Sequence, residues 1–283
     1  MTITKLRRNY HKEICQRILG LRSGAPNFAD VGSKTSRILA LGVIERIGFH
    51  LCQHPPVGQT VGTVFAGITM DYLNRSFRLL RHIRPGKWVF SASQASIGIA
   101  AFDQYEHLAL LEDALKAHKD LAAALGGDYI ITPDIVIGRE PLSDTEINKS
   151  KDRLGNGPIS TLTPLRRDNY PEGKPILHAS ISCKWTIRSD RSQNTRTEAL
   201  NLIRNRKGKT PHISCVTAEP MPTRLASLAM GTGDIDCVYH MALSELTASV
   251  KVSGNEDQGD MLDTLITGKR LRDISDLPFD LVS

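Results

Sequence analysis

Three stretches in the first half of the chain repeat hydrophobic residues at helical spacing. They cover residues 36–50, 64–83 and 105–127, and the third is closed by Gly126 and Gly127. Glycine is the residue that most often ends a helix. This pattern predicts a mostly helical N-terminal half.

From residue 128 onward, short strand-like runs alternate with helical ones. The run at residues 128–138, DYIITPDIVIG, contains Pro133, which predicts an edge strand, a bulge or a bend. Residues 141–175 are rich in Pro, Gly, Asn and charged residues and are expected to form a long connection. Further strands are predicted at 177–187, 212–217 and 235–239, and further helices at 194–205, from 222, at 241–251 and at 258–267.

Strands that alternate with helices predict a central sheet covered by helices. We therefore expect an α/β fold with a central mixed β-sheet flanked by helices. The helical first half is expected to pack on the same sheet, so that residues 1–283 form one domain.

The composition permits a nucleic-acid partner without requiring one. The chain carries 36 Lys and Arg against 30 Asp and Glu, a net charge of +6, and many basic proteins bind no polyanion. No run of about 18 apolar residues and no apolar signal-peptide core occurs, so no membrane span is expected. The five cysteines are odd in number and form no C-x-x-C pair, which favours reduced thiols in a cytosolic protein over disulfides or a zinc site.

The stretch HASISCKWTIRSDR, residues 178–191, differs from an ordinary strand. Lys184 lies in the middle of the predicted strand, and Arg188, Asp190 and Arg191 follow it directly. One interpretation is an edge strand with a solvated lysine and a polar turn. The other is a nuclease active site with a DNA-reading loop beside it.

A nuclease needs a metal ion to stabilise charge and activate water, and Mg²⁺ prefers carboxylate and carbonyl oxygens. A lysine near the phosphate can add charge stabilisation. Asp134, in a Pro-Asp pair, lies on the first predicted strand and Lys184 on the next, but Ser182 stands where a second acid is usual. Glu198, on the following helix, could supply that carboxylate, and the backbone carbonyl of Cys183 could bind the metal. Each feature alone is common, and only their combination favours a nuclease.

Longer stretches then resemble the NgoMIV-type restriction endonucleases, which are type II enzymes of the PD-(D/E)xK class. The resemblance extends over nearly the whole chain and is weakest in the connection at 141–175. It is carried by VGQT (57–60), HIRPGKW (82–88), LAAALGGDYIITPDI (121–135), LHASISCKWTIRSDR (177–191), LNLIRNRKG (200–208), VTAEPMPTR (216–224), GTGDIDCVYH (231–240) and GKRLRDISDLPFDL (268–281).

The resemblance implies a metal-dependent endonuclease. Asp134 matches the metal-binding aspartate, Lys184 the lysine of the Ser182-Cys183-Lys184 motif, and Glu198 the relocated acid. It also implies two Mg²⁺ ions per active site, a water nucleophile and 5′-phosphate ends. The family further implies a homotetramer of two dimers, each holding one duplex, in the bacterial cytoplasm.

The resemblance implies double-stranded DNA containing GCCGGC as the substrate. Arg188, Asp190 and Arg191 match residues that read the central CCGG in the major groove. Arginine can donate to guanine O6 and N7, and aspartate can accept from cytosine N4, so the chemistry suits this role.

Three further positions match DNA contacts of the family. Arg224 matches the reader of the outer guanine, and Ser33 lies in the segment that assists it. Gln59 matches a minor-groove contact, where its side-chain oxygen can accept from the guanine N2 amino group. Ordinary structural roles remain open for Ser33 and Gln59.

The chain departs from the family at Ala66. The family has a glutamate there, whereas this chain has Phe65-Ala66, and alanine cannot bind a metal or its water. Either the position is dispensable, or Asp71 partly substitutes from another side of the helix, or the chain is a catalytically weakened form that still binds its site. We favour the last hypothesis.

Other functions fit the sequence less well. A DNA-binding regulator without catalysis would gain nothing from a buried lysine that faces two acids. A structure-specific repair nuclease would not need base-edge readers. A nucleotide hydrolase would need a G-x-x-x-x-G-K-[ST] loop, which the sequence lacks.

Overall fold

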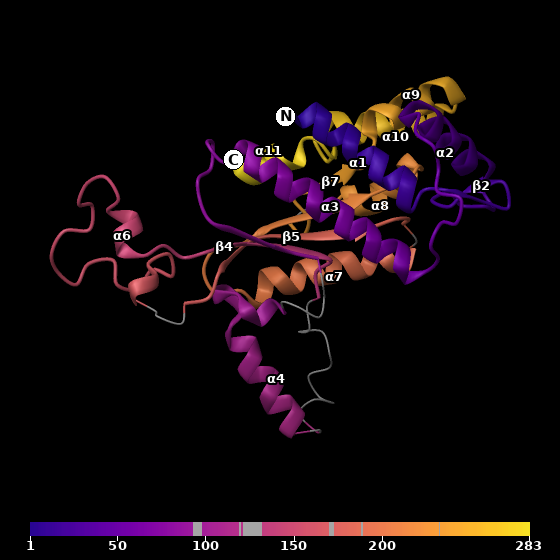
Figure 1. Cartoon of the computed structure of the whole chain (residues 1–283). Helices are drawn as coiled ribbons and strands as arrows, with labels where there is room; N and C mark the ends of the chain where they lie inside the picture. Colours follow the sequence, from indigo (N-terminus) through magenta and orange to yellow (C-terminus); the bar gives the residue numbers. More distant parts are fainter. Residues whose placement is uncertain (93–97, 119, 121–131, 170–172, 188, 232) are drawn as a thin grey trace.

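A six-stranded mixed sheet forms the centre of the protein in the computed structural model (Figure 1). The structure describes all residues except 93–97, 119, 121–131, 170–172, 188 and 232. The strands are β3 (Trp88–Ser91), β4 (Ile135–Arg139), β5 (Ile176–Lys184), β6 (His212–Thr217), β7 (Cys237–His240) and β8 (Leu271–Asp273).

The strands lie side by side in the order in which they occur in the chain. β3, β4 and β5 pair antiparallel, whereas β5 to β8 pair parallel. This arrangement confirms the predicted mixed sheet of an α/β fold. A small hairpin of β1 (Leu21–Arg22) and β2 (Ala25–Pro26) lies apart from it.

Helices cover both faces of the sheet (Figure 1). α3 contacts β3 and β5, with α1 packed on it, while α7 contributes to a cavity wall shared with β5 and β6 on the other side. The helices are α1 (Ile3–Arg17), α2 (Lys34–Ile47), α3 (Gln59–Leu80), α4 (His107–Ala117), α6 (Asp144–Ile147), α7 (Ser189–Asn205), α8 (Pro222–Ala229), α9 (Leu243–Ser253), α10 (Glu256–Thr267) and α11 (Leu277–Val282), with short 3₁₀ turns at Ile99–Ala101, Asp103–Tyr105 and Arg167–Asn169. None of these helices is both long and apolar enough to cross a membrane.

Local sequence explains where α2 begins and ends. The Ser33 hydroxyl accepts a hydrogen bond from the backbone N–H of Ser36 at 3.2 Å, which satisfies one of the unpaired donors of the first turn. Gly48 ends the helix at a φ of 70°, a conformation that glycine adopts without strain.

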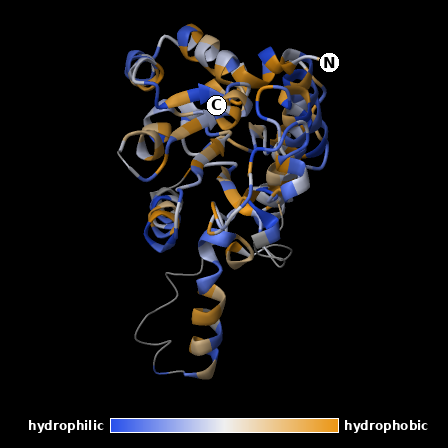
Figure 2. Ribbon diagram, turned by 90° about the vertical axis from the view of Figure 1, so that its left-hand side faces the viewer, coloured by the Kyte–Doolittle hydropathy of each residue, from blue (hydrophilic) through white to orange (hydrophobic). Residues whose placement is uncertain are grey.

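Two parts of the chain extend from the body. One is α4, and the other is the segment between β4 and β5 that contains α6 (Figure 1). Figure 2 shows hydrophobic residues on α4 although this helix projects outward. The second segment confirms the long connection predicted at 141–175, because little of it is regular structure.

The predicted elements agree with the structure to different degrees. The strand at 212–217 coincides with β6, and the helices predicted at 36–50 and 64–83 appear as α2 and α3. The strand predicted at 128–138 appears as Ile135–Arg139. Residues 132–134 are not strand, which corrects the prediction there, and 128–131 lie outside the described residues.

Two boundaries near residue 184 were predicted wrongly. Lys184 is the last residue of β5 rather than its middle, since pairing with β6 ends at Lys184 and Thr217. The helix predicted from 194 begins at Ser189. Ser and Asp favour helix starts, so Asp190 and Arg191 belong to the first turn of α7 and not to a loop.

Candidate active site and DNA-binding groove

Asp134 and Lys184 meet at the ends of two neighbouring strands. Asp134 immediately precedes β4, and Lys184 ends the antiparallel β5. The Lys184 Nζ lies 3.2 Å from the Asp134 Oδ2, and the same oxygen accepts the backbone N–H of Cys183 at 2.8 Å. The Asp134 Oδ1 takes part in neither bond, so it is the oxygen that could face a cation.

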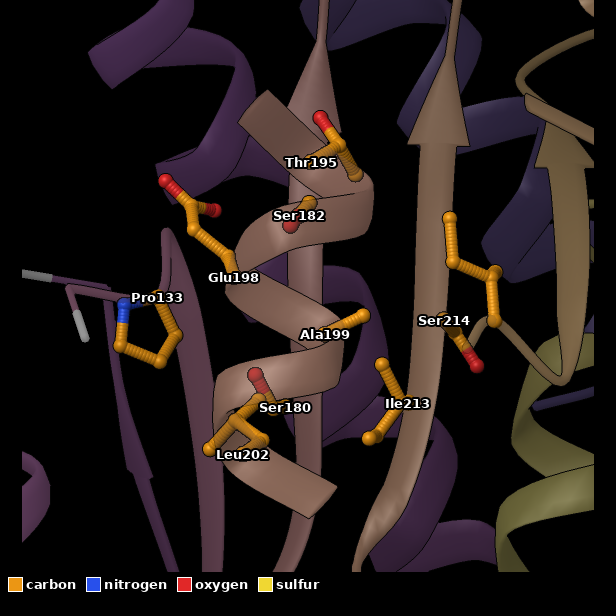
Figure 3. Close-up of a pocket in the computed structure, with 10 residues that line it drawn as sticks. Pro133, Ser180, Ser182, Thr195, Glu198, Ala199, Leu202, Ile213 and Ser214 are labelled. Atoms are coloured by element: carbon orange, nitrogen blue, oxygen red, sulfur yellow. The ribbon is translucent and has the colours of Figure 1, made fainter. Parts of the chain in front are cut away.

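α7 brings Glu198 to the same place. Glu198, Asp134, Cys183 and Lys184 line one cleft, as expected if this helix replaces the missing strand acid. Figure 3 shows Glu198 leaving the helix on the side of Ser182 and Pro133. The small Ser182 side chain therefore leaves room beside the strand for a carboxylate that comes from the helix.

Burial and charge set the protonation of this group. Burial by itself lowers the pKa of Lys184, but the carboxylates of Asp134 and Glu198 raise it above its ordinary value. Burial raises the pKa of Glu198, Lys184 opposes that shift, and Asp134 adds to it. The lysine is thus held as a cation between two acids.

The cleft is one half of a longer groove. It measures about 870 Å³ and is also lined by Gln59 and Ala66 of α3. A second cleft of about 750 Å³ contains Arg224, and both clefts are lined by Asn27 and Thr186. The shared lining residues join the clefts into one groove that leads from the acid–lysine group to Arg224.

The predicted DNA-reading residues have different positions relative to this groove. Arg224 forms an ion pair with Asp30, and their side chains are 36% and 37% exposed. Ser33 caps α2 and is not among the residues that line either cleft. Arg188 lies outside the described residues, and only the helical backbone of Asp190 and Arg191 is described.

The donor set fits a hard divalent cation. Two carboxylates and the backbone carbonyl of Cys183 offer the oxygen ligands that Mg²⁺ prefers. Within the described ranges, no group of three His, Cys, Asp or Glu side chains has metal-binding geometry. Ala66 contributes no ligand although it lines the cleft, and Asp71 is not among the lining residues.

Sequence reasoning missed two acids in the second cleft. Asp30 lies 194 positions from its partner Arg224, and no local pattern could join them. Glu219 lies two residues beyond the end of β6, the strand that pairs with β5, which ends at Lys184. Its place after a predicted parallel strand was a usable signal, because the carboxyl ends of neighbouring parallel strands lie at one edge of a sheet.

Known proteins resemble this chain over most of its length. The family model of the NgoMIV restriction enzyme matches residues 10–283. The type II restriction enzyme NgoMIV of Neisseria gonorrhoeae is 45% identical over 282 residues, 98% of either chain. Two solved structures are more distant: type IIF restriction endonuclease Bse634I with cognate DNA (TM-score 0.39, 18% identity, 92% of both chains) and restriction endonuclease PspGI with substrate DNA (TM-score 0.31, 14% identity, 94% of this chain and 98% of the other).

Proposed function

The chain belongs to the NgoMIV family of type II restriction enzymes, and from this membership we propose that it cleaves double-stranded DNA at GCCGGC. Site-specific DNA cleavage is the activity of this family. The observation that carries the proposal for this chain is the convergence of Asp134, Lys184 and Glu198 on one cleft.

The cleavage centre is proposed to use two Mg²⁺ ions. Asp134, Glu198 and the Cys183 carbonyl would hold the metal, which when bound stabilises charge on the phosphate and activates water. Lys184 stays protonated because its two acidic neighbours raise its pKa. It therefore acts as a cationic donor to the phosphate or the attacking water rather than as a base.

Sequence discrimination is assigned to the groove. Arg188, Asp190 and Arg191 would read the central CCGG, and their segment directly follows the strand that carries Lys184. Arg224 would read the outer guanine from the adjoining cleft.

The remaining two DNA contacts differ in their support. Gln59 lines the cleft beside the cleavage centre, which supports the proposed minor-groove contact. Ser33 would assist at the outer base pair mainly by ordering the start of α2, since its hydroxyl caps that helix.

We also propose a homotetramer of single-domain chains in the bacterial cytoplasm. Exposed apolar residues on the projecting parts support self-association: Leu110 is 75% exposed, and Ile159 and Leu162 are 63% and 84% exposed. One buried cluster reaches from Leu6 to Val282, which supports a single domain. The five cysteines are free thiols, which agrees with a reducing compartment.

The proposal is tested with two plasmids. One bears two GCCGGC sites, and the other has a central base of each site changed; both are incubated with Mg²⁺ and, separately, with Ca²⁺. We expect Mg²⁺-dependent cutting of the first plasmid only. Neither binding nor cutting at GCCGGC would refute the assigned specificity.

The alternative is a catalytically weakened form that binds the same site. It is favoured by the position of Ala66, which is 3% exposed and lines the cleft of the cleavage centre. A glutamate there would add a carboxylate beside the proposed metal ligands. Tight binding in Ca²⁺ without cutting in Mg²⁺ would support this alternative.

We predict that Ala66→Glu raises the Mg²⁺-dependent cleavage rate about tenfold or more, the effect of roughly 1.4 kcal/mol of transition-state stabilisation. Single-turnover cleavage and Ca²⁺-dependent binding are measured together, and binding of the site should change little. Ala92→Glu is the matched control, because Ala92 lines the same cleft. Equal cleavage rates for the original chain and Ala66→Glu would show that the position is dispensable.

A further inference from the structure

Glu219 is a buried carboxylate between the two predicted base-reading segments. It is 1% exposed and lies two residues beyond the end of β6. Its own backbone N–H donates to the Thr217 Oγ1 at 3.1 Å, which fixes the residue to the end of the strand. It is far more buried than glutamates usually are.

The two carboxylate oxygens accept hydrogen bonds from two different segments. Oε2 accepts the backbone N–H of Ile187 at 2.9 Å, and Oε1 accepts the backbone N–H of Met221 at 3.2 Å. Ile187 is the residue before Arg188, and Met221 is the N-cap of α8, the helix of Arg224. The Glu219 side chain therefore joins the segment that leads to Arg188 to the helix that carries Arg224.

The surroundings leave this carboxylate only partly stabilised. Burial raises the pKa of Glu219 to about 7, against the effects of the two backbone donors and of Arg224, while Asp30 adds to the rise. Among the described residues, His240 is a further titratable neighbour, and burial lowers its pKa to about 4. A carboxylate in a groove whose pKa is shifted this far by burial is a candidate for a functional role.

We infer that Glu219 is a positioning residue that holds the segment before Arg188 and the start of α8 in one fixed arrangement, so that the central and outer base pairs are read together. The inference rests on the proposed function and assigns Glu219 no contact with DNA. Its consequence is that discrimination at both kinds of base pair depends on a residue that reads neither.

Glu219→Gln tests this inference with almost no change of shape. The amide keeps one acceptor oxygen, but its NH₂ group faces the second backbone N–H, so one of the two bonds is lost. We expect discrimination to fall about tenfold at the central and the outer base pairs alike, the usual effect of losing one hydrogen bond to a charged group. Non-specific binding at low salt should stay unchanged.

The pH dependence separates positioning from general support of the fold. Only the ionised carboxylate accepts both N–H groups, so discrimination by the unaltered protein should improve as the pH rises through about 7. Glu219→Gln cannot ionise and should lack this step. His240 contributes nothing here because it titrates near pH 4.

The readout is selection from a pool of random duplexes in Ca²⁺, at about pH 6 and about pH 8. Arg224→Lys is included to show a loss of discrimination confined to the outer base pair. Glu256→Gln, which changes an exposed glutamate of α10 in the same way, is the matched control. If the unaltered protein selects a sequence other than GCCGGC, the proposed specificity is refuted. The inference about Glu219 is still decided, because it depends on whether Glu219→Gln discriminates less well than the unaltered protein at whichever sequence is selected.

Two results would overturn the inference. One is full discrimination by Glu219→Gln at both kinds of base pair. The other is a loss confined to the outer pair, as with Arg224→Lys. If circular dichroism shows that Glu219→Gln is unfolded, Glu219→Asp is tested in its place, because it keeps the charge but reaches the two backbone donors less well. We then expect a smaller loss of discrimination at the central and outer base pairs together. Unchanged discrimination by Glu219→Asp would refute the role.

Discussion

At the scale of single residues, the site is governed by one cation between two acids. Lys184 lies 3.2 Å from Asp134 and is further stabilised as a cation by Glu198. Mutual attraction allows three ionisable groups to remain partly buried in a cleft that must also accept a phosphate. The lysine therefore serves the assembly of the acids as well as the chemistry proposed for it.

Replacement of Lys184 should separate cleavage from recognition. Lys184→Met keeps most of the length of the side chain but removes its charge, so we expect Mg²⁺-dependent cleavage to fall about 10²-fold or more, as when a transition-state donor is removed. Ca²⁺-dependent binding should remain within a few-fold. Lys251→Met, on the exposed side of α9, is the control, and a loss of less than tenfold with Lys184→Met would argue against the assigned role.

At the scale of secondary structure, strand ends bring together residues that are distant in the chain. β4 begins beside Asp134, β5 ends at Lys184, β6 leads to Glu219, and α7, which packs beside β5 and β6, carries Glu198. β4, β5 and β6 each have one of these polar groups at or just beyond an end, whereas Glu198 comes from the middle of α7. The groove thus lies at the edge of the sheet where these strands begin or end.

The sequence predicted much of this arrangement and missed the rest for physical reasons. The strand at 212–217 and the sequence of alternating elements followed from hydrophobic periodicity. The end of β5 did not, because Trp185 and Ile187 are buried outside the strand and continue the apolar pattern. Pairing of Asp30 with Arg224 depends on tertiary contacts that no local pattern records.

A buried histidine in β5 gives a pH-dependent test of the fold. His178 is 8% exposed, and its Nε2 lies 2.7 Å from the carbonyl oxygen of Leu281 in α11. Burial lowers the pKa of His178 to about 4. This pKa is below the value of about 6.5 that a histidine has in the unfolded chain. The neutral His178 therefore contributes to the free energy of unfolding above about pH 6.5, and this contribution is lost as the pH falls toward 4.

We predict that His178→Gln removes part of this acid sensitivity. Glutamine can donate to the same carbonyl but does not ionise. Between about pH 7.5 and pH 5, the free energy of unfolding of the unaltered protein should fall by roughly 2 kcal/mol more than that of the variant. Urea unfolding at both pH values measures the difference. The exposed His50→Gln serves as control, and parallel pH profiles for the original chain and His178→Gln would contradict the prediction.

At the scale of the whole molecule, the groove proposed for DNA recognition and the residues proposed for self-association lie on different parts of the chain. The groove lies where the sheet, α3, α7 and α8 meet. The exposed apolar residues Leu110 and Leu162 lie on α4 and on the segment between β4 and β5. DNA binding and assembly can therefore be changed separately.

The proposed tetramer predicts a change of mass when these residues are made polar. Light scattering should show about four chains per particle for the original protein, with fewer for the double variant Leu110→Glu and Leu162→Glu, since burying a charge in an apolar interface is unfavourable. Val252→Glu, at a 76% exposed position of α9, is the matched control. A monomer before any substitution, or an equal change with Val252→Glu, would rule out this mode of assembly.

The strands of the six-stranded sheet lie in the order in which they are synthesised, so each can pair with its predecessor as it emerges. Asp134 leaves the ribosome first, then Lys184 and Glu198, and only later Glu219 and Arg224; within the six-stranded sheet, each strand after β3 pairs with the one before it in the chain. A nascent chain that has reached α7 holds the charged groups of the cutting centre, but β5 still lacks its parallel neighbour β6. β6 pairs with β5 just before the chain that carries Glu219 and Arg224 emerges, so the proposed cleavage centre and the proposed reading groove are completed in close succession.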